Sequence, residues 1–203
     1  MNLKKLIFAG LAFLALGSLN AQNIFKASAV MGFTLAQIDG DGLLGYDKVG
    51  LSAGLKIAYP LEDKLDIGME LLYSQRGSQS GFLAGGATIQ QTHLDYFEIP
   101  IYVTLKDWYI EKDGYHKIGI HAGFSYGYLL NITSANGLYE QDINEFNTSD
   151  ISWLIGPSYS PNPRWTFTAR FTRSFTKLFK SNRFINTDSL VSYFWTLRTE
   201  FNF

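Results

Sequence analysis

The chain has 203 residues, with 17 lysine and arginine side chains against 18 aspartate and glutamate side chains, and it has no cysteine. The balanced charge argues against a nucleic-acid partner held on a basic surface, and the lack of thiols excludes disulfides and cysteine-based metal or redox sites. Aromatic residues make up 16% of the chain and glycines number 19, a composition that favours an all-β fold.

Residues 1–21 have the features of a secretory signal peptide. Two lysines precede an apolar run from Leu6 to Leu16, and the small residue Ala21 marks the expected cleavage point. The apolar run is too short to cross a bilayer comfortably. We therefore expect an exported protein in which residues 22–203 form one domain.

Eight segments downstream alternate apolar and polar residues with a period of two. Such alternation places successive side chains on opposite faces of a strand, so each segment is predicted to be a strand with one apolar face. The predicted strands cover residues 27–37, 50–60, 65–77, 94–106, 117–130, 151–159, 165–177 and 193–203.

The connections between these segments alternate in length. Short turns are expected at 61–64, 112–115 and 160–163, and long loops at 38–49, 78–93, 131–149 and 178–190. Short turns on one rim and long loops on the other are typical of an up-and-down barrel of the outer membrane.

The apolar face meets lipid in a membrane barrel, whereas in a soluble, lipocalin-like barrel it would face the interior. Segments of about 9–13 residues are long enough to cross a bilayer at a tilt. Aromatic residues near the segment ends fit girdles at the two membrane interfaces; they are Tyr59, Tyr73, Trp108, Tyr109, Trp153, Tyr159, Trp165 and Tyr193. We therefore predict an all-β, eight-stranded, antiparallel up-and-down transmembrane β-barrel in the cell outer membrane.

The polar row then faces the lumen, which in an eight-stranded barrel is just wide enough to be filled by side chains. The lumen-facing charges are predicted to be Lys56, Glu70, Arg76, Glu98, Arg170, Arg198 and Glu200. Unpaired charges in so dry a space cost several kcal/mol, so we expect them to pair across the lumen. Inward glycines such as Gly54 and Gly68 are expected to leave room for the long charged side chains. Arg173 falls in the lipid row near the long-loop rim, within expected reach of lipid phosphates.

The last predicted strand ends on Phe203, with Trp195, Leu197 and Phe201 on the same face. This pattern resembles the C-terminal signal read by the barrel-assembly machinery of Gram-negative outer membranes. The expected partners are therefore outer-membrane lipid and, during insertion, that machinery.

Three stretches together resemble the PorT-like outer-membrane β-barrel family: residues 32–61, "MELLYSQRG" at 69–77 and "FEIPIYVTLK" at 97–106. The resemblance implies a barrel, and because the family's namesake is tied to type IX protein secretion, it implies secretion-system proteins as partners. Most members have no assigned activity. The residues on the family motif positions are Glu70, Arg76, Glu98 and Pro100, which we interpret first as interior packing.

Few residues of the chain have the types and spacing of a catalytic or metal site. A lipid-modifying enzyme would need a serine, a histidine and a carboxylate on the lipid-facing rim. His93 lies near Asp95 at the long-loop rim without an evident serine, and the other histidines are His116 and His121. The aspartates Asp39, Asp41 and Asp47 lack the order of a Ca²⁺-binding EF-hand loop.

We therefore predict no catalytic residues, no cofactor and no metal site, and a scaffold or binding role for a barrel with a filled lumen. Two alternatives stay open: a narrow small-solute porin and a lipid-modifying outer-membrane enzyme.

Overall fold

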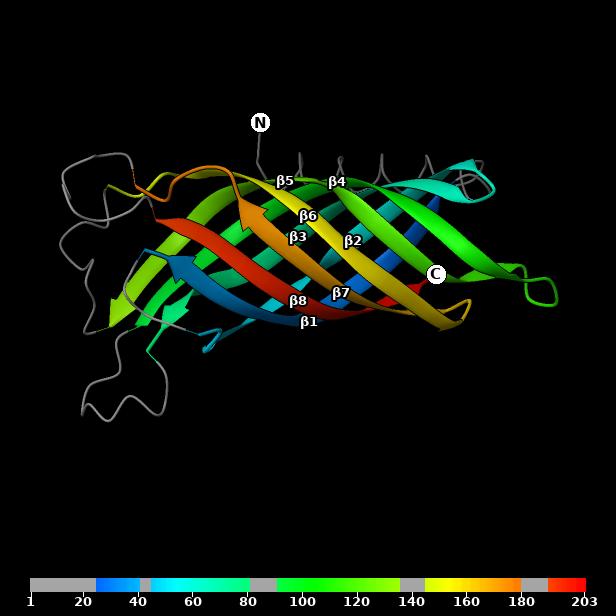
Figure 1. The fold of residues 1–203 in the computed structure, drawn as a ribbon, viewed down its shortest axis with the longest axis horizontal. Coiled ribbons are helices and arrows are strands. Elements are labelled where there is room, and N and C mark those ends of the chain that lie inside the picture. Colours follow the sequence, from blue (N-terminus) through cyan, green and yellow to red (C-terminus); the bar gives the residue numbers. More distant parts are fainter. Residues whose placement is uncertain (1–24, 41–44, 81–90, 136–144, 180–189) are drawn as a thin grey trace, which may run out of the picture.

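In the computed structural model, eight strands form one closed barrel in which every strand pairs antiparallel with its neighbours in the chain, and β1 pairs with β8 (Figure 1). The structure describes residues 25–40, 45–80, 91–135, 145–179 and 190–203. The strands are β1 (Lys26–Asp39), β2 (Lys48–Glu62), β3 (Leu65–Gln79), β4 (Gln91–Ile110), β5 (Tyr115–Ala135), β6 (Ser149–Asn162), β7 (Trp165–Ser174) and β8 (Val191–Asn202). The expected signal peptide lies outside the described residues.

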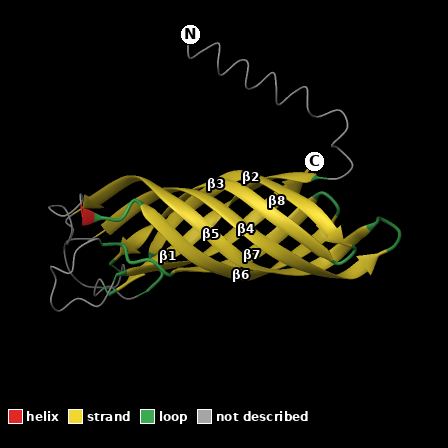
Figure 2. Cartoon of the chain, turned by 90° about the horizontal axis from the view of Figure 1, so that it is seen from above, coloured by secondary structure: helices red, strands yellow, loops and turns green. Residues whose placement is uncertain are grey.

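The short turns β2–β3, β4–β5 and β6–β7 lie at one end of the barrel, on the same side as the C-terminal residue (Figures 1 and 2). The other four connections join strand ends at the opposite end, as predicted. The turn after β4 contains Gly114, whose φ of 66° suits the tight reversal expected there. No helix in the described ranges is long and apolar enough to cross a bilayer.

Several strands are longer than the sequence pattern predicted. β4 has 20 residues and β5 has 21, and they pair as far as Gln91 and Ala135 near the long-loop end. Hydrogen bonding between backbones continues there after the alternation of apolar and polar side chains has ended. A register shift between Asp95 and Tyr96 accompanies this extension.

The apolar row faces outward and the polar row inward, as predicted for a membrane barrel. Outward residues such as Phe33, Leu55 and Phe124 are 58–62% exposed, whereas Glu70 and Arg76 are at most 1% exposed. This arrangement excludes the soluble barrel, which would bury the apolar row.

The outward face of β4 shows how far the apolar band, the belt of uncharged outward side chains around the barrel, extends along the barrel axis. Between Asp95 and Asp107, its outward residues are Phe97, Ile99, Ile101, Val103 and Leu105, none of them charged. Twelve residues of strand cover about 40 Å, or about 30 Å along the axis at a tilt of about 40°. That height matches the hydrocarbon thickness of a bilayer.

Candidate functional site: a lumen filled by side chains

The middle of the lumen is occupied by charged side chains arranged around Glu70 of β3. The Glu70 carboxylate accepts two hydrogen bonds of 2.7 Å from the guanidinium of Arg198 and two of 3.0 Å from that of Arg170. The hydroxyl of Tyr102 donates a further hydrogen bond to it. Two-pronged pairs of this kind are strong and directional, so Glu70 ties β3 to β7 and β8 across the barrel. The central cluster, as we name it, consists of Lys56, Glu70, Arg170, Arg198 and Glu200.

Glu200 extends this network toward the short-turn end. Its carboxylate pairs with Lys56 Nζ at 2.7 Å and with Arg198 Nη2 at 3.0 Å. The hydroxyl of Thr168 donates to the same carboxylate at 3.0 Å. The side chain of Lys56 is 19% exposed, against 2% for Glu200, so Lys56 forms the edge of the cluster.

His121 lies next to the central cluster, and its contact with Arg170 requires a neutral imidazole. Arg170 Nε donates to His121 Nε2 at 3.0 Å, so that nitrogen acts as the acceptor and the proton sits on Nδ1. With His121 neutral, the central cluster has three cations and two carboxylates. It therefore carries one surplus positive charge.

A second group of charges lies nearer the long-loop end, and we name it the loop-side cluster: Arg76, Glu98 and Asp150. Arg76 donates to Glu98 through Nε at 2.8 Å and to Asp150 through Nη1 at 2.6 Å. Its guanidinium is sandwiched between the rings of Tyr96 and Phe194, at 4.5 and 4.3 Å from their centroids. The loop-side cluster has one surplus negative charge, which balances the surplus of the central cluster.

Beyond the loop-side cluster, apolar side chains fill the lumen. The apolar cap, as we name it, consists of Ile38, Leu94, Tyr96, Leu129, Phe146, Leu178 and Leu190, each at most 8% exposed. Phe146 comes from the β5–β6 connection and Leu178 from the chain after β7. A backbone hydrogen bond of 2.7 Å from Asn147 N to Leu178 O joins the two segments.

Among the described residues, the lumen opens at the short-turn end into a cavity of about 740 Å³ that is lined by residues of all eight strands. We name this cavity the vestibule. Lys106 and Asp66 form an ion pair of 2.6 Å on its wall, and Lys56 lies at its floor. Deeper in the barrel, beside Arg170 and Arg198, the structure has a void of only about 10 Å³. Such a void holds at most one water molecule.

These features agree with the comparison with known protein families. Residues 16–180 match the family described as "Outer membrane protein beta-barrel domain". The chain belongs to this family. The barrel is therefore an outer-membrane protein, and the soluble alternative is excluded a second time. No curated protein matches the chain in sequence.

Solved structures of other outer-membrane barrels are similar in fold. Ail of Yersinia pestis is 13% identical, with a TM-score of 0.49 over 88% of this chain and 98% of that chain. Neisserial surface protein A is 14% identical, with a TM-score of 0.45 over 88% of this chain and 97% of that one. OprG from Pseudomonas aeruginosa is 10% identical, with a TM-score of 0.42 over 89% and 94% of the two chains.

The structure of this outer-membrane barrel places all seven predicted lumen charges inside and joins them into two groups. The loop-side cluster holds Arg76 and Glu98, and the other five form the central cluster. Asp150 was missed, although it precedes Ser152 in the inward row by two residues. Tyr102 and the pair Asp66–Lys106 also belong to the inward row and were not singled out as part of the filling.

The inward glycines do not make room for arginine and glutamate in the way predicted. A Cβ on Gly68 would lie 2.8 Å from the ring of Tyr102, and a Cβ on Gly127 would lie 3.1 Å from the ring of Tyr96. At Gly54 a Cβ would collide with the backbone carbonyl of Leu71. The glycines therefore leave space for tyrosine rings or allow neighbouring strands to approach closely.

Arg173 lies in the outward row, as predicted, and the structure gives it a protein partner. Its Nη2 is 3.5 Å from Asp39 Oδ2, and its guanidinium lies over the ring of Tyr193 at 5.7 Å. Asp39 is thus an ion-pair partner, while Asp41 lies outside the described residues. Phe203 lies on the outward face at the short-turn rim, 80% exposed, with its ring 5.9 Å from that of Phe201.

The three histidines have partners other than serine within the described ranges. His93 Nε2 lies 3.0 Å from Asp95, and the ring of His116 packs against Tyr109 at 5.0 Å. His121 accepts from Arg170, as described above. Among the described residues, no group of three or more histidine, aspartate or glutamate side chains is placed to hold a metal ion.

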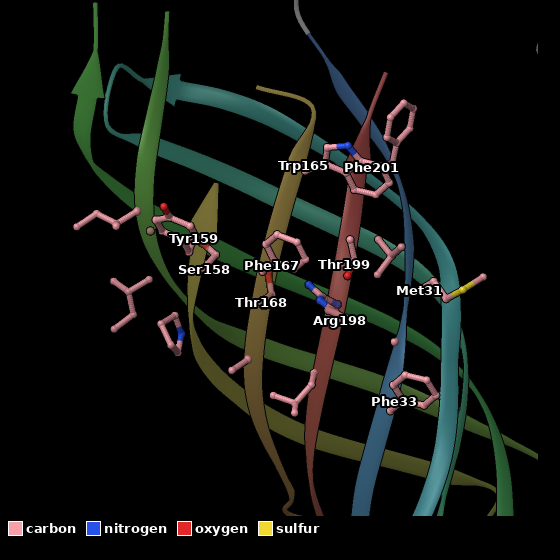
Figure 3. A pocket seen from close by; sticks show the side chains of 18 of the residues that line it. Met31, Phe33, Ser158, Tyr159, Trp165, Phe167, Thr168, Arg198, Thr199 and Phe201 are labelled. Carbon is pink, nitrogen blue, oxygen red and sulfur yellow. The ribbon is translucent and has the colours of Figure 1, made fainter. Parts of the chain in front are cut away.

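The lipid-facing wall has a hollow of about 1180 Å³ that involves mainly β5, β6, β7, β8 and β1 (Figure 3). The outward side chains of Trp165, Phe167 and Phe201 stand around Thr199, and Met31 and Phe33 line the β1 side (Figure 3). This hollow lies within the apolar band, so bilayer lipid covers it.

Proposed function

We propose that this barrel acts as a non-enzymatic scaffold or binding protein of the outer membrane, not as a diffusion pore. The observation that carries this proposal is the filling of the lumen by three successive layers: the central cluster, the loop-side cluster and the apolar cap. A solute that entered the vestibule would meet Lys56 and Glu200 first, and would have to displace paired, buried charges to pass. The contacts of the barrel with partner proteins would then lie on the long-loop rim or on the lipid-facing wall.

The proposal extends to the partners. The stretches 69–77 and 97–106 resemble the PorT-like family, and this resemblance supports a connection with type IX protein secretion. Glu70, Arg76 and Glu98 of these stretches serve as lumen filling, so partner contacts would come from other residues.

The test is purification from native outer membranes in mild detergent, followed by mass spectrometry of co-purifying proteins. We expect secretion-system components in stoichiometric amount, and none with an equally tagged, unrelated barrel from the same membrane. If chemical crosslinking before extraction still yields the barrel alone, the scaffold role in secretion is wrong.

The absence of enzymatic activity is part of the proposal and has its own test. In the described residues no serine hydroxyl hydrogen-bonds to a histidine, and His121 is buried and accepts a hydrogen bond from Arg170. Lipid A from cells that overproduce the barrel should therefore have an unchanged mass spectrum. A new lipid A species that depends on His93 would contradict the proposal.

A further inference from the structure

We propose that the vestibule is a binding site for a small solute that carries an oxyanion, either a carboxylate or a phosphate, and enters from the periplasm. Short turns of outer-membrane barrels face the periplasm, so the vestibule opens to that compartment. Its volume of about 740 Å³ lies within the usual range for small-molecule sites.

The walls of the vestibule supply hydrogen-bond donors. Ser28, Thr104, Ser158 and Thr166 line the cavity together with the amide of Asn202. Some are already linked to one another: Ser28 donates to Asn202 Oδ1 at 2.7 Å. These hydroxyl, amide and ammonium groups can hydrogen-bond a polar ligand, and Phe25, Tyr115 and Ile118 add apolar surface to the same lining.

The charge of the vestibule selects the sign of the ligand. Among the side chains of its wall, Lys26 and Lys106 are positive and Asp66 is negative, which leaves one surplus positive side-chain charge; the last residue, Phe203, lies at the exposed rim of the cavity. The floor is the central cluster, which has another surplus positive charge. Low-dielectric walls concentrate such a field inside a cleft, so the vestibule attracts anions.

Two lysines are placed to contact an anion directly. Lys106 and Lys56 have side chains that are 13% and 19% exposed, and both line the cavity. An ammonium group has three N–H donors. Among the described residues, Lys106 donates to Asp66 and Lys56 to Glu200, so each has donors left to approach a ligand from the wall and the floor.

The closed floor decides what happens to a bound anion. Lys56, Glu200 and the rest of the central cluster separate the vestibule from the long-loop side. The anion therefore binds and leaves through the same opening, and the site is a receptor-like pocket without transport.

The test is a titration of the folded, full barrel in lipid nanodiscs, followed by NMR. Inorganic phosphate and citrate are added separately at constant ionic strength, so that the two arms distinguish phosphate from carboxylate ligands. We expect saturable shifts at the backbone amides of Ser28, Lys106 and Asn202 with at least one of the two. Exposed amides at the long-loop rim should not shift.

Charge variants give the sharpest prediction. Lys26→Gln and Lys106→Gln should each weaken binding by about threefold to tenfold, and Asp66→Asn should strengthen it by a similar factor, because each changes the charge of the wall by one unit. The matched control is Lys64→Gln, which removes a lysine from the same rim. Lys64 pairs with Asp107 and its side chain is 63% exposed, outside the vestibule, so affinity should not change.

Lys26 is exposed, so its variant folds even if a variant in the Asp66–Lys106 pair does not. Shifts that never saturate with either anion would overturn the proposal. So would a Lys64→Gln variant that weakens binding as much as Lys26→Gln, because general surface charge would then explain the attraction.

Discussion

Glu70 shows how much of the barrel's interior depends on one carboxylate. It is 1% exposed and accepts hydrogen bonds from two guanidinium groups and one phenol, contributed by β4, β7 and β8. Without its negative charge, Arg170 and Arg198 would face each other in a space that water does not reach. Repulsion and lost solvation would then act together.

We therefore expect Glu70→Gln to lower the free energy of unfolding by about 3–5 kcal/mol, the usual effect of removing one partner of a buried ion pair. Urea unfolding of the barrel in lipid vesicles, followed by tryptophan fluorescence, measures this change. The control is Lys64→Gln, which breaks an exposed pair and should leave the unfolding midpoint unchanged. An unfolding curve for Glu70→Gln that overlays the wild-type curve would show that the central cluster does not stabilise the barrel.

The sequence predicted seven of the charged residues that lie inside, but not which of them pair. A period of two assigns each residue to a face, and Glu70 and Arg198 were assigned inward for this reason. Their contact depends on strand tilt and on the stagger between strands, which alternation does not record. Asp150 was missed because the predicted strand began at Ile151, one residue too late to include it.

At the scale of the elements, the outward rows determine where the barrel sits in the membrane. Ile101 of β4 lies opposite Phe124 of β5, midway between the outward residues Asp95 and Asp107. This position corresponds to the middle of the apolar band. Leu61, at the end of β2, lies at the short-turn rim and is 50% exposed, as is Ile101.

Ile101→Arg should therefore destabilise the barrel in lipid vesicles by about 2–4 kcal/mol, and Leu61→Arg by about 0–1 kcal/mol, because the cost of a lipid-facing arginine depends on depth. Unfolding in urea, with the same vesicles for both variants, measures the difference. Equal costs at the two positions would contradict the placement of the bilayer around β4.

The number and order of the strands followed from alternation and loop length, whereas their ends did not. β4 and β5 extend toward the long loops through residues such as His93 and Thr133, where polar side chains face outward and alternation is lost. The apolar cap was not predicted for a related reason. Phe146 lies in a stretch expected to be loop, and a single aromatic in a loop has no periodic signal.

For the whole molecule, the three layers of the lumen act in series. Removing one layer leaves the others in place, so Phe146→Ala should remove part of the apolar cap without creating a conducting path. Current across planar bilayers containing this variant measures the effect. Adding Glu70→Ala, Arg170→Ala and Arg198→Ala to Phe146→Ala shortens side chains in two of the three layers; because the loop-side cluster stays in place, steady channels should still be absent. Steady channels in Phe146→Ala alone would show that the charged clusters do not close the lumen.

The balance of charge inside the barrel is also a property of the whole. The surplus positive charge of the central cluster and the surplus negative charge of the loop-side cluster cancel each other, while Lys48, which is 5% exposed, adds a further buried positive charge toward the long-loop end. The vestibule lies beside the positive cluster, and its predicted affinity for anions follows from that order along the axis.

The most direct test of the closed lumen is single-channel recording of the wild-type barrel in planar bilayers, with incorporation verified and a large-pore porin recorded in parallel. We predict no steady current steps for this barrel in molar potassium chloride at either polarity, while the porin conducts. Regular current steps that scale linearly with voltage would contradict the account, because ions would then have a path through or past the paired charges around Glu70.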